Sequence, residues 1–126
     1  MPGYTIKNLR EVEDAAVKFG LSPDVEARFA ARPLGAETVG LSLQRLAPNS
    51  QQPFGHRHRE DEEIYVVVGG SGVVTLDGEQ HQLRPWDAIR VAPDTTRLFA
   101  AGPEGLEFLA FGANSGTDDV ESFPAG

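Results

Sequence analysis

The sequence contains no cysteine and few basic residues, and both shortages exclude classes of function. Without cysteine, the 126-residue chain has no disulfide, no thiolate metal ligand and no cysteine nucleophile. Eleven Lys and Arg residues against nineteen Asp and Glu residues give a net charge of −8, which argues against nucleic acid and anionic membranes as partners. The chain also lacks a transmembrane-length apolar run and a signal-peptide pattern at its N-terminus. We therefore expect a cytoplasmic protein.

Turn residues divide most of the chain into short segments with the alternation typical of β-strands. The length fits one domain with its own core, and no internal repeat is visible. Asp77-Gly78 predicts a tight hairpin, whereas Gly69–Gly72 and Gly102–Gly105 are expected to be turns that separate strands. The predicted strands cover 25–29, 38–46, the segment around His56, 64–68, 73–76, 79–83, 88–92, 96–100 and 106–111. This pattern predicts an all-β sandwich or barrel with little helix.

Two of the three histidines, His56 and His58, stand one residue apart and precede an acidic run, 60–63. Side chains at positions i and i+2 of a strand point to the same face, so the two imidazoles are expected to lie side by side. A carboxylate from the next strand would complete a two-His, one-carboxylate set, which suits Fe, Mn, Ni or Zn. The third histidine, His81, is better explained as a structural or exposed residue. We expect a divalent transition metal and no organic cofactor.

The spacing around the two histidines resembles the first sequence motif of the cupin superfamily. That motif consists of Gly, His-x-His, three or four residues, Glu, six residues and Gly. Here His56-x-His58 is followed by four residues, then Glu63, then six residues and Gly70. The resemblance implies a small single-domain jelly-roll β-barrel with its site inside the barrel. It also implies that His56, His58 and Glu63 are the metal ligands.

The acidic run leaves two registers open for the carboxylate ligand. Glu62, with Gly69 six residues after it, also fits the looser form of the motif. Glu63 is preferred, because cupins usually place the ligand Glu directly before an apolar strand, and 64–68 is such a strand. Tyr65 shares strand parity with Glu63 and is expected to point inward.

The chain resembles the second cupin motif in its spacing but lacks the histidine of that motif. It runs Gly, five residues, Pro-x-Gly, two residues, His, three residues, Asn, and the segment 85–99 places Arg97 at the position of the histidine. Arginine does not deprotonate and cannot ligate a metal, and its charge opposes a nearby divalent ion. Two alternatives follow. Arg97 pairs with Glu63 and leaves no metal, or it turns aside to hold an anionic substrate beside a metal on the three ligands.

These residues predict a site for a small molecule. Gln52 and Phe54 share parity with the first histidine, so both are expected at the pocket mouth, and Arg97 and Tyr65 are expected to contact the ligand. The leading hypothesis is a metal-binding cupin that binds or acts on a small polar, anionic metabolite. The resemblance implies oxygenase or isomerase chemistry if the protein is catalytic. The alternative is a non-enzymatic, metal-free cupin used for ligand sensing or as a structural module.

The whole chain divides into three parts. Residues 1–36 are expected to form an N-terminal extension with an edge strand, 37–112 the barrel, and 113–126 a C-terminal tail that acts as a loose flap. The segment 64–68 is apolar on both faces, so the face outside the barrel needs a cover. We therefore expect the extension to pack there on the barrel or on a partner, and we predict a homodimer.

Overall fold

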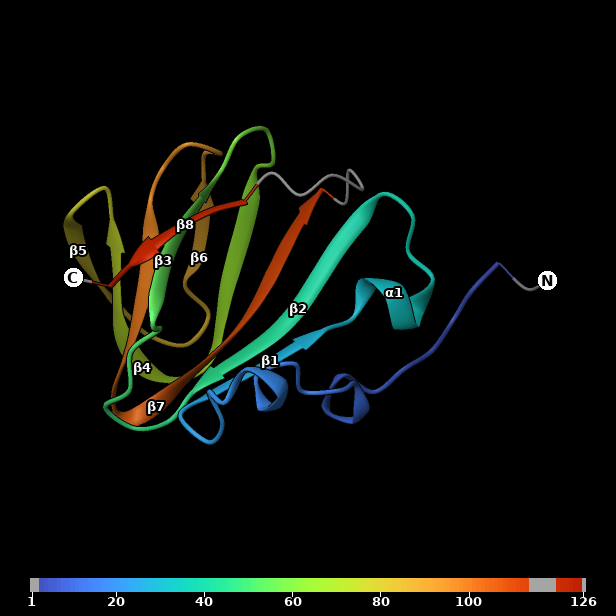
Figure 1. Cartoon of the computed structure of the whole chain (residues 1–126), viewed down its shortest axis with the longest axis horizontal. Helices are drawn as coiled ribbons and strands as arrows, with labels where there is room; N and C mark the ends of the chain where they lie inside the picture. The colour runs from blue at the N-terminus through green and yellow to red at the C-terminus, as the bar shows by residue number, and fades with distance from the viewer. Residues whose placement is uncertain (1–2, 114–119, 126) are drawn as a thin grey trace.

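The computed structural model describes residues 3–113 and 120–125, and most of them lie in antiparallel strands (Figure 1). The strands are β1 (Val25–Phe29), β2 (Val39–Leu46), β3 (Phe54–His58), β4 (Glu63–Leu76), β5 (Glu79–Leu83), β6 (Ala88–Val91), β7 (Arg97–Ala113) and β8 (Val120–Pro124). One short helix, α1 (Ala31–Leu34), and two 3₁₀ turns, η1 (Leu9–Glu11) and η2 (Val17–Phe19), complete the described elements. The prediction of an all-β fold with little helix is confirmed.

The described strands form one sheet that curls round on itself (Figure 1). Its main path runs β1-β2-β7-β3-β8, and β4 pairs with β5, β6 and β7. Partner residues across an antiparallel pair point to the same face, so the core side chains lie together on one face of the curled sheet. Tyr65, Phe99 and Phe108 lie there fully buried, with the rings of Phe99 and Phe108 stacked 4.4 Å apart. Burial of these large rings supplies much of the hydrophobic stabilisation.

The two glycine-rich segments do not separate strands, so this part of the strand prediction is wrong. β4 is continuous over 14 residues and β7 over 17 residues, and they pair along almost their whole length. The glycines instead produce register shifts between Val67 and Gly69 and between Gly70 and Gly72. Such bulges bend a strand without ending it, which lets the sheet curl. The Asp77-Gly78 hairpin is confirmed, since Leu76 pairs with Glu79.

The two ends of the chain pack on the sheet. The N-terminal extension adds β1 beside β2, and its Val12 and Ala16 are buried. β8 pairs antiparallel with β3 over five residues, so the expectation of a loose flap is wrong for Val120–Pro124. The rest of that tail, residues 114–119 and 126, lies outside the described residues. No helix within residues 3–113 and 120–125 is long and apolar enough to cross a membrane.

Candidate metal centre

Strands β3 and β4 bring two imidazoles and one carboxylate together. The Nε2 atom of His58 lies 3.0 Å from Oε1 of Glu63, and the Nε2 atom of His56 lies 3.5 Å from the same oxygen. One ligand atom from each of the three residues lies within 4.8 Å of the others. The two imidazole rings sit edge to face, with centroids 5.2 Å apart. The alternation of β3 produces this arrangement, because both histidines point to one face of the strand.

The arrangement of these three residues fits a divalent transition metal. Ligand atoms about 2.1 Å from a metal and at right angles to each other lie about 3.0 Å apart. The two imidazole–carboxylate separations, 3.0 and 3.5 Å, are close to that value. Two neutral imidazoles and one carboxylate also form a donor set that Fe, Mn, Ni and Zn accept. His56, His58 and Glu63 are therefore the residues that could hold such an ion.

Glu63 is held in its ionised form. Burial of its carboxyl group raises the pKa, but hydrogen bonds from His56 and Tyr65, together with the positive charge of the two histidines in their protonated, metal-free form, outweigh burial and lower the pKa to about 2. The Tyr65 hydroxyl donates to Oε1 of Glu63 at 2.5 Å. A carboxylate that is already ionised needs no deprotonation before it binds a metal.

Tyr65 is fixed between the core and the carboxylate. Its side chain is 1% exposed, and its ring packs against Phe99 at 4.9 Å and Phe108 at 5.9 Å. Burial raises the pKa of its hydroxyl well above 10, the charge of Glu63 and the hydrogen bond to it raise the pKa further, and the charge of Arg97 lowers it. Tyr65 is thus a neutral hydrogen-bond donor that holds one carboxylate oxygen of Glu63 in place.

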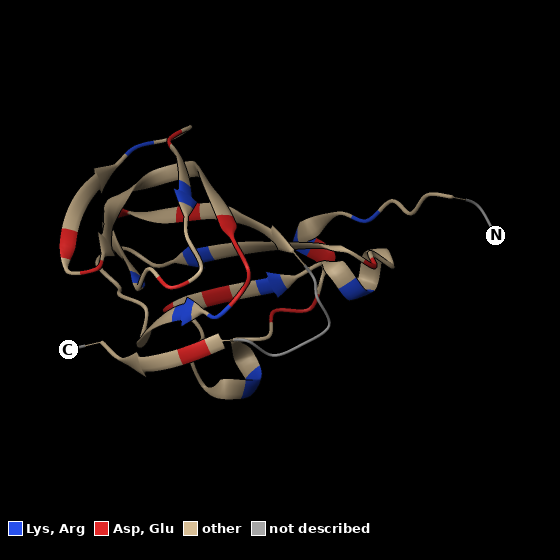
Figure 2. Cartoon of the chain, turned by 90° about the horizontal axis from the view of Figure 1, so that it is seen from above, with Lys and Arg blue, Asp and Glu red and all other residues tan. Residues whose placement is uncertain are grey.

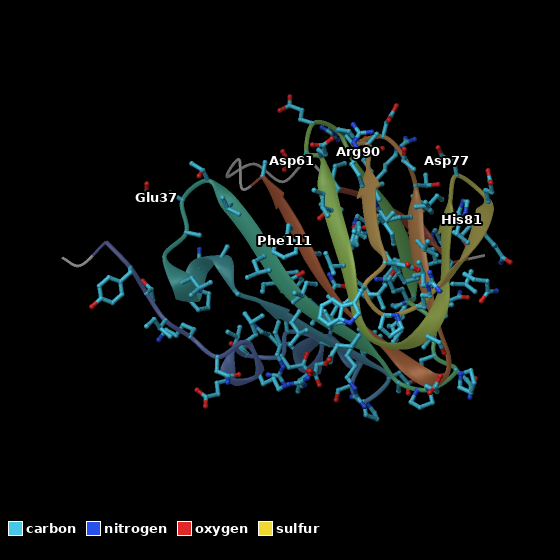
Figure 3. The ribbon with its side chains drawn as sticks, turned by 180° about the vertical axis from the view of Figure 1, so that it is seen from behind. Glu37, Asp61, Asp77, His81, Arg90 and Phe111 are labelled. Carbon is cyan, nitrogen blue, oxygen red and sulfur yellow. The ribbon has the colours of Figure 1, made fainter. Side chains whose placement is uncertain are left out.

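Glu62 and His81 lie away from this cluster. Glu62 is exposed, and its Oε2 accepts a hydrogen bond from Nε of Arg90 at 2.6 Å. Figure 3 shows His81 beside the turn that carries Asp77, where its Nε2 lies 3.6 Å from Glu79. Of the two registers that the acidic run left open, the structure brings Glu63 to the histidines.

Arg97 points into the protein without touching the carboxylate. Its side chain is completely buried, and its guanidinium donates to the carbonyl oxygens of Ala92 at 3.2 Å and Pro93 at 3.5 Å. Among the described residues there is no ion pair between Arg97 and Glu63, so the first of the two alternatives for this arginine is not what the structure shows. A cavity lies next to the three ligands, and the described residues that line it do not include Arg97.

A cavity of about 870 Å³ adjoins the cluster and includes its three residues in its wall. Tyr65, Gln52 and Phe54 line it, although Phe54 is 55% exposed at the mouth and the Oε1 atom of Gln52 accepts the backbone N–H of Phe99. The polar or charged lining residues that the sequence prediction did not include are Arg32, Ser42, Gln44 and Ser122. The alternation of β2 could have indicated the first polar pair, Ser42 and Gln44, but α1 and β8 reach the cavity only through tertiary packing.

Comparison with known proteins gives one curated relative with a named activity. A dimethylsulfoniopropionate lyase of Ruegeria pomeroyi is 38% identical over 82 residues, which cover 64% of this chain and 52% of the lyase. The chain therefore spans about half the length of that relative.

Solved structures support the fold. A cupin protein from Bacteroides fragilis superposes with a TM-score of 0.74 at 24% identity, covering 100% of this chain and 97% of the other. A polyketide cyclase from Streptomyces resistomycificus gives a TM-score of 0.72 at 24% identity, covering 86% of this chain and 78% of the cyclase. The family described as "Cupin domain" matches residues 42–112, which is more than half of the sequence. The chain is a member of the cupin family.

Proposed function

We propose that this cupin binds one divalent transition metal on His56, His58 and Glu63 and uses the adjoining cavity for a small, polar, anionic metabolite. The observation that carries the proposal is the convergence of two imidazoles and an ionised carboxylate, with ligand atoms within 4.8 Å, on the wall of a cavity. Cavities of this size hold small molecules, and a few polar groups in the wall orient them. Ser42, Gln44 and Ser122 are such groups here.

The proposed division of labour follows from the positions of the side chains. A bound metal would supply Lewis acidity toward a ligand oxygen. Tyr65 keeps the carboxylate of Glu63 in position through its hydrogen bond. The buried rings of Phe99 and Phe108 close the core behind Tyr65 and keep water out on that side.

Three kinds of reaction are proposed for this site. Oxygenase or isomerase chemistry follows from the family resemblance. A lyase reaction on a zwitterion, which carries a sulfonium as well as a carboxylate and so differs from the anionic metabolite, is favoured by the identity to the dimethylsulfoniopropionate lyase over 64% of this chain. Incubation of the metal-loaded protein with dimethylsulfoniopropionate, followed by proton NMR, tests the lyase reaction directly. Consumption of the compound supports it, and an unchanged spectrum at high protein concentration removes it.

Metal content separates the metalloprotein from a metal-free cupin that senses a ligand or serves as a structural module. We expect untagged protein, incubated with Fe, Mn, Ni or Zn and then desalted, to retain about one metal ion per chain by elemental analysis. His58→Ala should lose the metal, because it removes one of three ligands. His81→Ala is the matched control, since it removes an imidazole outside the cluster and should retain the metal. Wild-type protein without stoichiometric metal would establish the metal-free alternative.

The outer face of the sheet supports a proposed homodimer. Leu41, Phe111 and Ile64 are neighbours across β2, β7 and β4, and they form an apolar row opposite to the face of Tyr65. Ile64 is 43% exposed and Val39, nearby on β2, is 57% exposed. We expect sedimentation at micromolar concentration to give a dimer and Ile64→Lys to give a monomer, because a charge at an apolar interface loses its hydration. A monomeric wild-type protein would remove the proposal.

A further inference from the structure

Arg97 is a buried cation that forms no salt bridge with a carboxylate among the described residues. It is the single charged side chain among the fully buried residues that the structure describes, at 0% exposure. Its guanidinium makes two hydrogen bonds to neutral carbonyls, one of them long, and its Nε atom has no hydrogen-bond partner within the described residues. Buried charges in proteins are normally paired, because loss of hydration destabilises an isolated ion by several kcal/mol. Because no salt bridge neutralises it, the charge of Arg97 can stabilise an anion that binds near it.

The position of Arg97 places its charge behind the metal centre. Arg97 on β7 is the direct pairing partner of His56 on β3, so both side chains point to the same face of the sheet. Its charge also acts on the hydroxyl of Tyr65, which contacts Glu63. The arginine thus lies near the site, across the wall of the cavity rather than in it.

The cavity differs in charge from the rest of the protein. The chain carries a net charge of −8, and Figure 2 shows acidic and basic residues distributed along its strands and loops. Among the described residues that line the cavity, the one carboxylate is Glu63 and the one Lys or Arg is Arg32 on α1. With a divalent ion on the triad, Glu63 and Arg97 cancel each other and two positive charges remain, before Arg32 at the exposed wall is counted.

We propose that the cavity selects a doubly charged anion, a small dicarboxylate, an inference that rests on the proposed metal site. Arg97, behind the wall of the cavity, supplies part of the positive charge that attracts this anion. Arg97 is then a specificity-determining residue: its positive charge attracts the bound anion electrostatically, and its side chain does not contact the ligand. Because the field crosses a poorly solvated interior, a unit of charge there affects ligand affinity more than a unit of charge at the surface.

Three four-carbon probes of different charge test this selection in the Mn-loaded protein. Succinate is a dianion at pH 7.5, butanoate is a monoanion, and butanamide is neutral. We expect isothermal titration calorimetry to show succinate binding at least about tenfold more tightly than butanoate, with butanamide weakest. Equal affinity for succinate and butanoate in wild-type protein that holds its metal would overturn the inference without any variant.

Substitution of Arg97 identifies the source of the selection. Arg97→Met keeps an unbranched side chain and removes the charge, and it should lower the succinate-to-butanoate affinity ratio by about tenfold. Arg97→Lys keeps the charge and should retain most of the ratio. Arg84→Met is the matched control, because it makes the same change in net charge at a side chain that is 87% exposed, and it should leave the ratio unchanged. Thermal denaturation shows which variants are folded.

The outcomes separate this inference from the proposed function. Protein that never retains metal sinks the proposed function. If the protein retains metal but Arg97→Met and Arg97→Lys both keep the wild-type succinate-to-butanoate affinity ratio, the role of Arg97 alone is contradicted. If Arg97→Met does not fold, the wild-type comparison decides: succinate bound about tenfold more tightly than butanoate supports the inference, and equal affinities contradict it.

Discussion

Glu63→Gln is expected to lower the affinity for a divalent metal by at least about 100-fold. The substitution keeps the size and shape of the side chain and removes the negative charge, and a neutral amide is a poor ligand for Fe, Mn, Ni or Zn. Substitution of residues that merely support a ligand already costs about 10- to 100-fold in metal affinity, so loss of the single anionic ligand should exceed that range. Competition with a chromogenic chelator measures the change.

Glu62→Gln is the control for this experiment. It removes the same charge from the adjacent residue, so the net charge of the two variants is identical. The Glu62 carboxylate is exposed and bonded to Arg90, and it should contribute little to the metal. We expect wild-type affinity for this variant. An affinity that falls with Glu62→Gln and stays with Glu63→Gln would show that the carboxylate register is the other one.

The difference between these neighbouring acids shows what strand alternation can predict. Adjacent residues of a strand point to opposite faces, so Glu62 and Glu63 could not both face the histidines. The apolar strand that follows favoured Glu63, and the structure places its carboxylate 3.0 Å from His58. The same alternation predicted that Gln52 and Phe54 share a face with His56, and both line the cavity. These positions depend on local geometry, which the sequence contains.

Features that depend on tertiary packing could not be predicted in this way. Alignment with the second motif places Arg97 at the inward position of the motif's histidine, but it does not say whether the guanidinium contacts Glu63, the cavity or the backbone. The carbonyls of Ala92 and Pro93, which it meets, belong to the turn after β6. The cavity walls supplied by α1 and β8 depend equally on long-range contacts, and no residue pattern in 31–34 or 120–124 indicates a site.

The prediction of turns at the two glycine-rich segments is wrong for a physical reason. Glycine is favoured both in turns, where a strand ends, and in bulges, where a strand bends and continues. Composition alone does not separate the two. The hairpin predicted at Asp77-Gly78 is confirmed, because that pair is specific for tight hairpins. The Gly69–Gly72 segment instead faces Gly105 and Leu106 across the β4–β7 pair, and only the pairing partner reveals why it is rich in glycine.

Gly70→Ala is expected to destabilise the protein by at least ~3 kcal/mol or to prevent folding. Gly70 has φ of +78°, which L residues rarely adopt, and a Cβ atom there would lie 2.0 Å from the carbonyl oxygen of Gly105. The obstacle is backbone in the paired strand, so it cannot turn aside like a flexible side chain. Relief of the clash requires β4 and β7 to separate at the bulge. Urea unfolding followed by circular dichroism measures the loss.

Gly78→Ala separates the clash from the backbone conformation. Gly78 has φ of +83°, but a Cβ atom there would meet nothing within 4 Å. This variant should cost only ~1–2 kcal/mol, the penalty for a left-handed L residue. A Gly70→Ala variant no less stable than Gly78→Ala would show that β4 and β7 can shift at the bulge. The half of β4 before Gly70 carries Glu63 and Tyr65, so such a shift would also move the Glu63 carboxylate relative to the histidines. The metal affinity of Gly70→Ala therefore reports whether the bulge keeps the three ligands in position.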